Sequence, residues 1–181
     1  VCRFLKYLEA GEDIVIGSPI ANRGQAEAAG LIGFLSNTMV LRTDMSGSPT
    51  FRELLHRLRQ RLLGAYAHEA MPFEVLFDKL RPHKDPRRQQ ALFRVIFNLQ
   101  SIPMPDLSLP ELRIEPYEVD TQLAPMDLNF LLQETGGGVE GFVTYKSALL
   151  DRDSIARLLK HYKTLLESAV SRPDEHISSI P

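Results

Sequence analysis

The sequence lacks several features that would assign it to particular protein classes. It has a single cysteine, Cys2, so no internal disulfide can form, which is compatible with a reducing compartment. No apolar run approaches the roughly 20 residues that span a bilayer, and the chain does not open with a secretory signal pattern. The net charge of -2 lacks the basic excess of a dedicated nucleic-acid binder. We therefore expect a soluble, cytoplasmic protein that binds neither membranes nor nucleic acids.

The spacing patterns of common metal and catalytic sites are also missing. The five histidines are scattered, and none lies at metal-ligand spacing from a second His, Cys or carboxylate. Ser18 and Ser36 lack the Gly-x-Ser-x-Gly context of a hydrolase nucleophile. The glycines at 136 to 138 stand between two strand patterns and so do not form a phosphate loop. We predict no metal site.

What the sequence does contain is enough apolar residues for one compact domain. Of its 181 residues, 44% are hydrophobic, and there is no internal repeat. Short β-branched or alternating runs predict strands at 13–17, 38–43, 92–100, 112–119, 126–134 and 139–145. The three glycines before Val139 predict that a hairpin turn joins the last two strands.

Helical spacing predicts four helices, at 1–10, 50–67, 72–80 and 151–171. Thr50 and Glu53 form the sequence pattern of a capping box, and Pro72 suits the first turn of the third helix. The core face of the last helix is predicted to carry Ile155, Leu158, Leu159, Tyr162, Leu165 and Leu166. This order of elements predicts an α/β fold, a mixed β-sheet with helices packed on one side.

The two ends of the sequence suggest a piece of a longer protein. Residues 1–10 have helical spacing without a preceding capping residue, so we expect the beginning of that helix to be missing. At the other end, Pro173 stops the last helix. We expect the domain to cover residues 1–173 and residues 174–181 to begin a linker to a following domain.

Three segments resemble motifs of one family, the condensation domains of nonribosomal peptide synthetases. Residues 32–42, Ile-Gly-Phe-Leu-Ser-Asn-Thr-Met-Val-Leu-Arg, resemble the family's Ile-Gly-x-x-x-Asn-Thr-x-x-x-Arg. Residues 68–74 are similar to its His-Gln-Asp-x-Pro-Phe-Glu, and residues 85–93 to its Arg-Asp-x-Ser-Arg-x-Pro-Leu-Phe. The third match departs from the family at 87–91, where Arg-Arg-Gln-Gln-Ala stands in place of the common Ser-Arg-x-Pro.

The resemblance implies a specific part of the family's architecture. Condensation domains consist of two lobes, each similar to chloramphenicol acetyltransferase, with an active-site tunnel between them. This chain resembles the C-terminal lobe over essentially its whole length. The family's catalytic His-His-x-x-x-Asp-Gly ends the first lobe and is absent from this sequence. The resemblance therefore implies no catalytic residue in this chain, which would work with an N-terminal lobe.

The resemblance also implies where substrates pass. It places Asn37 beside the tunnel with Ser36 and Thr38, where the amide would orient a thioester carbonyl or the attacking amine. Ser18 to Arg23 resembles a family segment that leads into a loop of the tunnel floor, with Asn22 and Arg23 at its start. The alternatives are that Asn37 and Thr38 simply end a strand, and that the loop is an ordinary flexible connection.

Two further residues of these motifs have structural interpretations. Arg42 is predicted to hold a strand end or to pair with a carboxylate. His68 is predicted to cap a helix or to lie on the surface, because the helix dipole favours a histidine at a C-terminus.

By resemblance, the intact domain joins a donor acyl or peptidyl thioester to an acceptor amine. Both substrates ride on the phosphopantetheine arms of carrier proteins, so no cofactor is bound directly, and an adenylation domain is a neighbour. Carrier proteins of these synthetases are typically acidic, so the basic residues Arg52, Arg57, Arg59 and Arg61 or those at 79–94 are candidates for a carrier contact. The alternative is that these charged faces are simply solvated. Alternatives are an epimerization or heterocyclization domain, the Asn-Thr pair favouring condensation over epimerization, or a non-catalytic recruitment domain of the same fold.

Overall fold

The computed structural model describes residues 11–24, 26–80, 92–100, 112, 124 and 126–180. The strands are β1 (Asp13–Ile20), β2 (Asn37–Asp44), β3 (Val95–Gln100), β4 (Leu128–Thr135) and β5 (Gly138–Tyr145). The helices are α2 (Ala26–Ala29), α3 (Phe51–Tyr66), α4 (Phe73–Leu80) and α5 (Arg152–Ser171). The predicted helix at 1–10, most of the predicted strand at 112–119 and the motif segment 85–91 lie outside the described residues.

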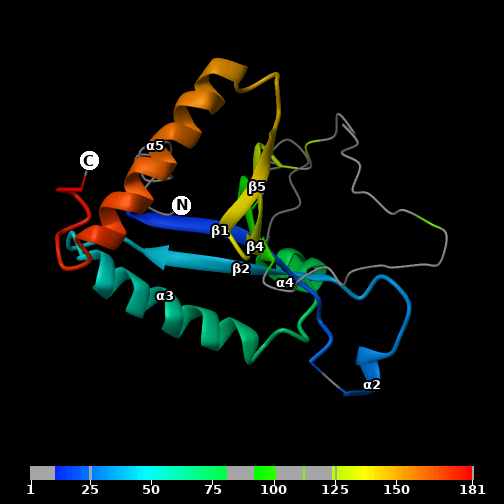
Figure 1. Cartoon of the computed structure of the whole chain (residues 1–181). Coiled ribbons are helices and arrows are strands. Elements are labelled where there is room, and N and C mark those ends of the chain that lie inside the picture. Colours follow the sequence, from blue (N-terminus) through cyan, green and yellow to red (C-terminus); the bar gives the residue numbers. More distant parts are fainter. Residues whose placement is uncertain are drawn as a thin grey trace.

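The five described strands form one mixed sheet in the order β2-β1-β3-β4-β5 (Figure 1). The two outer pairs are antiparallel, and β3 runs parallel to both β1 and β4. β4 and β5 are joined by the two-residue turn Gly136-Gly137, which confirms the predicted hairpin. The predicted mixed sheet is therefore confirmed.

β1 is longer than the predicted strand at 13–17, because it continues through Pro19 to Ile20. The amide of Met45 donates to the carbonyl of Glu12 at 2.7 Å, so every second residue of β1 from Glu12 onward is hydrogen-bonded to β2. Pro19 is one of the residues between these hydrogen-bonded positions, so its nitrogen points away from β2. On that side β3 pairs with β1 only at Gly17, so the missing N–H of Pro19 leaves no described pairing broken.

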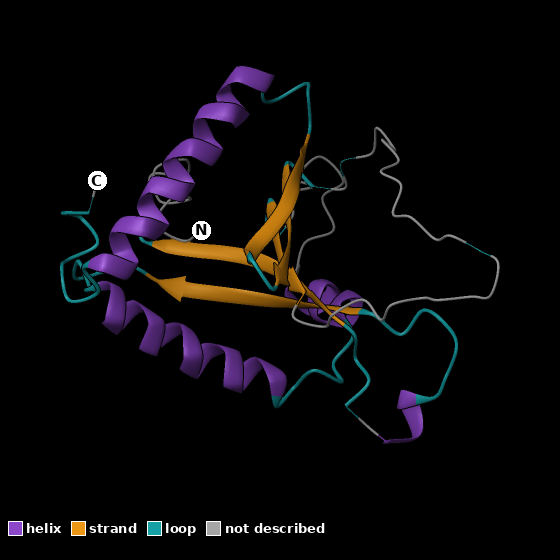
Figure 2. Ribbon diagram, viewed as in Figure 1, coloured by secondary structure: helices purple, strands orange, loops and turns teal. Residues whose placement is uncertain are grey.

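One face of the sheet packs against both long helices, which border it in Figure 2. Alternation along the strands places the side chains of Ile14, Ile16, Leu41, Val95, Leu128 and Phe130 on this face, where all are buried. α3 contributes Leu54 to the same core, and α5 contributes Ile155 and Leu158. The prediction of helices packed on one side holds for these two helices.

The short helix α4 departs from that arrangement. Its Phe73 ring lies 5.5 Å from the ring of Phe93, and the Phe93 ring covers Gly17. Gly17 faces away from its buried neighbour Ile16 because side-chain direction alternates along a strand. The α4 aromatic residues therefore belong to the opposite face of the sheet.

Helix α5 begins where predicted, and its core face differs in part from the prediction. Asp151 is the N-cap, and its side chain accepts a hydrogen bond from the Ser154 amide at 2.8 Å. The prediction was wrong for Leu159 and Leu166, each 40% exposed. The buried stripe ends instead at Ala169, a residue too small to stand out in the apolar pattern.

The segment after α5 packs against the start of α3, so the predicted boundary at residue 173 lies inside the packed structure. Thr50 and Glu53 form the predicted capping box, and the next two free amides of α3 donate to carbonyls of this segment. Ile177 and Ile180 are buried. Residues 174–180 are therefore part of the fold, and a following domain stays a prediction.

Asp127 ties the beginnings of β3 and β4 to the end of β5. Its carboxylate accepts hydrogen bonds from Arg94 and, at 3.0 Å, from Lys146. Burial raises the pKa of the Asp127 carboxyl, but the hydrogen bonds and charges of Arg94 and Lys146 outweigh it, and the pKa is lowered overall. Stability from this group is therefore present above the ordinary carboxyl pKa and is lost as pH falls through the folded-state value.

We expect Asp127→Asn to lower the free energy of unfolding by about 1–2 kcal/mol at neutral pH, because it removes the negative charge and one of the two oxygens that accept from cationic partners. Urea unfolding at pH 7 and near pH 3 is the measurement, with the exposed Asp78→Asn as control. The difference between wild type and Asp127→Asn should shrink at the lower pH. A difference that is the same at both pH values would contradict this role.

Candidate functional site

The side-chain amide of Asn37 joins two of the sequence motifs. Asn37 is the first residue of β2, and its Nδ2 donates to the carbonyls of Glu69 at 2.9 Å and Met71 at 2.8 Å. Its Oδ1 accepts from the backbone amides of Thr38 at 2.8 Å and Phe73 at 3.0 Å. The Phe73 amide is otherwise a free donor at the start of α4, so Asn37 caps α4 from a distant part of the chain. We call this group of contacts the Asn37 junction.

These four hydrogen bonds use the full capacity of a primary amide, which has two N–H donors and two acceptor positions. The Asn37 amide therefore has no free position with which to hold a thioester carbonyl or an amine. This geometry argues against the direct orienting role that the resemblance implied. It also goes beyond the strand-end alternative, because three of the four partners lie more than 30 residues further along the chain.

The junction extends to Phe93, which belongs to the third motif. Phe73 packs on Phe93, which is 4% exposed, and a Cβ added at Gly17 would lie 2.4 Å from the Phe93 ring. Only glycine leaves room for that ring. Because Gly17 sits in the middle of β1, the aromatic contact fixes α4 against the sheet.

The predicted floor loop is fastened at the same end of β1. Asn22 adopts a left-handed backbone with φ of 51°, which asparagine tolerates better than most residues and which turns the chain out of the strand. The Arg23 guanidinium then donates to the carbonyls of Ala28 at 2.7 Å, Leu31 at 2.6 Å and Gly33 at 3.2 Å. The described part of this loop is therefore held by a central cation, in contrast to an ordinary flexible connection.

Beyond Arg23 the loop exposes apolar side chains that the sequence analysis did not select. Ile32 and Phe34 are at least 92% exposed, and Leu31 is also exposed. Ser36 is exposed beside them, and Thr38 is half-buried. The available signal was an apolar run next to Gly33 that fits neither strand nor helix spacing. An apolar tip held out by an organised loop is typical of a contact surface.

The structural interpretations of two motif residues are confirmed. Arg42 forms a two-pronged ion pair with Asp13, with Nε to Oδ1 at 2.8 Å and Nη2 to Oδ2 at 2.8 Å. The His68 ring nitrogen Nδ1 lies 2.9 Å from the carbonyl of Gly64, in the last turn of α3. Both side chains thus hold ends of secondary structure, as predicted.

Part of the predicted basic surface is already engaged. Arg52 pairs with Asp174 at 2.7 Å, and Arg57 donates to the carbonyls of Asp44 and Ser46.

Within the described residues, no cluster of three or more His, Cys, Asp or Glu is arranged to hold a metal ion. No helix in the described ranges is both long and apolar enough to cross a membrane.

The comparisons with known proteins agree with this assembly of motifs. The sequence profile of the condensation domain matches residues 1–181. The chain belongs to the condensation domain family. It is 38% identical over 180 residues to one polypeptide of the linear gramicidin synthase of Brevibacillus parabrevis, with 98% of this chain matched. That match covers 4% of the synthase polypeptide, so this condensation-domain chain corresponds to a small part of its relative.

Solved structures resemble the fold closely. The X-domain in its complex with OxyB from teicoplanin biosynthesis matches 99% of this chain and 40% of its own, at 28% identity and a TM-score of 0.83. The condensation domain of the monacolin K polyketide synthase matches 96% of this chain and 40% of its own, at 19% identity and a TM-score of 0.83. The chloramphenicol-acetyltransferase-like fold expected from the resemblance is therefore confirmed.

We expect Asn37→Ala to lower the free energy of unfolding by about 2 kcal/mol, because it leaves several partly buried backbone groups without partners. Thermal and urea unfolding are the measurements, with Ser36→Ala as a matched control at an exposed neighbouring position. Unchanged stability in Asn37→Ala would mean that the junction contributes little to the fold.

We expect Gly17→Ala to destabilise the domain by about 1–3 kcal/mol, because the added methyl group overlaps the Phe93 ring. Gly30→Ala is the control, since a Cβ at Gly30 has no atom within 4 Å. Unfolding by urea with near-UV circular dichroism reports both stability and aromatic packing. Equal stability of the two variants would show that Phe93 can move aside.

Proposed function

We propose that this chain is the C-terminal lobe of a condensation domain that joins a carrier-bound acyl or peptidyl thioester to a carrier-bound amine. The observation that carries the proposal is the Asn37 junction, where segments matching the family's motifs interlock around one amide. Two further facts support it. The family profile covers the whole chain, and the chain matches about 40% of a solved condensation domain.

In this proposal the lobe provides a rigid wall beside the substrates. The thioester is already activated, so holding two tethered reactants in line supplies much of the rate, and proton handling falls to groups of the other lobe. The phosphopantetheine arms of the donor and acceptor carriers would enter between the lobes. Asn37 and Arg23 act here as positioning residues, since their polar atoms are engaged with backbone groups.

The exposed apolar tip at Ile32 and Phe34 is the proposed contact with the N-terminal lobe. It directly precedes Asn37, so the junction fixes its position relative to the sheet. Contacts between units of one chain typically cover 600–1,500 Å². An exposed phenylalanine and isoleucine at the end of an organised loop would form the apolar centre of such a contact.

A second candidate is a recruitment domain without peptide-bond chemistry. It is favoured by the 28% identity to the X-domain solved in complex with OxyB, which is higher than the 19% identity to the monacolin K condensation domain. Recruitment would require an external partner on the lobe and no His-His motif in the preceding lobe. An epimerization or heterocyclization domain would differ in the chemistry of the same tunnel.

The test joins this lobe to a lobe that carries His-His-x-x-x-Asp-Gly and supplies carriers loaded with an acyl donor and an aminoacyl acceptor. We expect condensed product by intact mass from the joined lobes and none above background from the 181-residue chain alone. Phe34→Ser in the joined domain should lower turnover at least tenfold, while the melting temperature of the 181-residue chain alone, in which Phe34 is exposed, should change little. Val170→Ser, a substitution of an exposed apolar residue on α5, is the control.

Product formed equally well by the 181-residue chain alone would overturn the division of labour between lobes. No product from the joined lobes, together with tight binding of a tailoring enzyme, would favour the recruitment function instead.

A further inference from the structure

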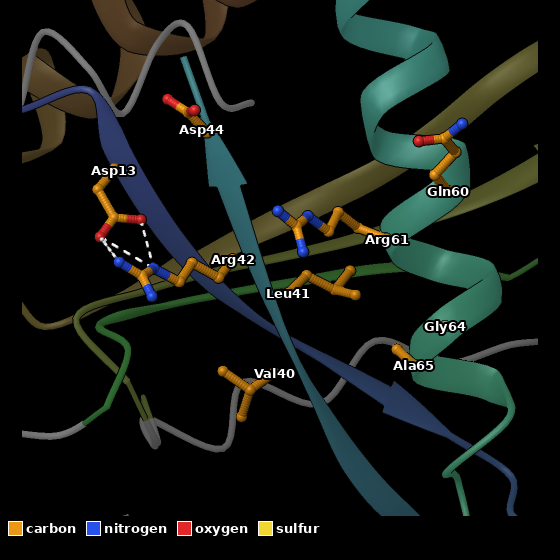
Figure 3. A pocket seen from close by; sticks show the side chains of 9 residues that line it. All are labelled: Asp13, Val40, Leu41, Arg42, Asp44, Gln60, Arg61, Gly64 and Ala65. Carbon is orange, nitrogen blue, oxygen red and sulfur yellow. Dashed lines mark hydrogen bonds and ion pairs between the residues drawn. The ribbon is translucent and has the colours of Figure 1, made fainter. Parts of the chain in front are cut away.

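A pocket of about 630 Å³ lies beside the end of β2, apart from the Asn37 junction. Its walls are β2 on one side and the last turns of α3 on the other, which run side by side (Figure 1). Its lining includes Val40, Arg42, Asp44, Arg61 and Gly64. Figure 3 shows Arg61 pointing from α3 into the space beside β2, with the Arg42 and Asp13 pair on the other side of the strand.

β2 is an edge strand of the described sheet, and Val40, Leu41, Arg42 and Asp44 of this strand line the pocket. The Met45 amide donates to the Glu12 carbonyl, which sets the hydrogen-bonding pattern of the antiparallel pair. Counting back from Met45, every second residue of β2 directs its N–H and C=O groups toward β1. The residues between them, including Val40 and Arg42, direct their N–H and C=O groups away from β1. Among the described residues, no strand pairs with these four groups.

The open stretch has defined ends. At one end the Asp44 carbonyl accepts a hydrogen bond from Arg57 at 3.1 Å, and at the other the Thr38 amide donates to the Asn37 side-chain oxygen. Between them, Val40 and Arg42 offer two donors and two acceptors at the spacing of a β-ladder. Native proteins usually cover or charge such an edge, because it will pair with another extended chain.

The helix that faces this edge has room and positive charge. A Cβ at Gly64 has no atom within 4 Å, so α3 has no side chain there that would fill the space. Arg61 makes no hydrogen bond and no ion pair within 4 Å among the described residues, whereas Arg42 is paired with Asp13 and Arg57 with backbone carbonyls. The Asp44 carboxyl in the same pocket is held mainly by Ser46, and the charges of Arg57 and Arg61 add to the lowering of its pKa. One guanidinium in the pocket is thus available to a ligand.

The charge on α3 decides which kind of chain fits. The helix carries four arginines and one glutamate. Symmetric pairing of β2 with the β2 of a second copy would bring two such helices together, and like charges oppose that. A strand that carries a carboxylate would instead pair with Arg61.

We propose that the β2 edge at Val40 and Arg42 binds an extended polypeptide segment that bears an acidic side chain. The segment adds a short strand to the sheet by backbone hydrogen bonds, and its carboxylate pairs with Arg61. This surface lies on the α3 side of β2, distinct from the apolar tip at Ile32 and Phe34. It therefore recruits a linker or tail of a partner independently of the condensation chemistry.

The test uses the full chain and a fluorescein-labelled octapeptide of alternating threonine and valine with one central glutamate. Fluorescence anisotropy at low salt measures binding, with a glutamine version and a backbone N-methylated version as control peptides. We expect the glutamate peptide to bind at least threefold tighter than the glutamine peptide. The N-methylated peptide should not bind, because it lacks strand donors.

Three variants separate the contributions. Val40→Pro removes an outward N–H that β1 does not use and should weaken binding at least tenfold. Gly64→Leu should fill the pocket and weaken binding while keeping or raising the melting temperature, because leucine is a stronger helix former than glycine. Arg61→Gln should abolish the preference for glutamate over glutamine. Thermal melts of all three variants establish that they are folded.

Amide hydrogen exchange gives a direct readout of the strand. Saturating glutamate peptide should slow exchange at Val40 and Arg42 at least tenfold and leave Leu54 unchanged. Absence of binding, or binding that Gly64→Leu does not weaken, would overturn the proposal. A free chain that is dimeric in sedimentation and becomes monomeric in Val40→Pro would also overturn it, because the occupant would then be a second copy.

Discussion

The rest of this structure depends on one saturated side-chain amide at the start of β2. Because Asn37 pairs with Ile20 in the sheet, its position is set by the register of β1 and β2. Its hydrogen bonds then place the turn at 69–71 and the first amide of α4. Phe73 follows directly and reaches Phe93 above Gly17. A single polar group thus links the sheet to the α4 side of the fold, and side chains of similar size would not offer both two donors and two acceptors.

Local patterns in the sequence were sufficient for most elements, because caps and strand alternation depend on neighbouring residues. The Thr50 and Glu53 capping box, the start of α5 at residue 151 and the glycine hairpin are of this kind, as is His68 at the end of α3. The function of Asn37 could not be read this way, because its partners lie far along the chain and offer only backbone atoms. The burial of Ile177 and Ile180 likewise depends on a contact across the fold, between the end of the chain and α3. The local helical pattern also assigned Leu159 and Leu166 to the core, although no contact across the fold buries them fully.

In the proposed function, this arrangement lets the chain contribute through rigidity. Arg23 and Asn37 use their polar atoms on the backbone, and the result is an apolar tip at Ile32 and Phe34 held at a fixed place. β2 therefore has two different parts. Its beginning is closed by the junction and follows the tip, and its middle leaves Val40 and Arg42 open beside a basic helix. We infer that the closed end serves the partner lobe and the open edge serves a separate chain.

The most direct test of this account is site-resolved amide hydrogen exchange by NMR in wild type and Asn37→Ala. In wild type, the Thr38 and Phe73 amides should be protected with similar opening free energies, because both donate to the same oxygen. In Asn37→Ala both should lose protection together, while the Leu54 amide in α3 keeps its own. Rapid exchange of Phe73 in wild type, or protection that survives removal of the amide, would contradict the central place given to Asn37.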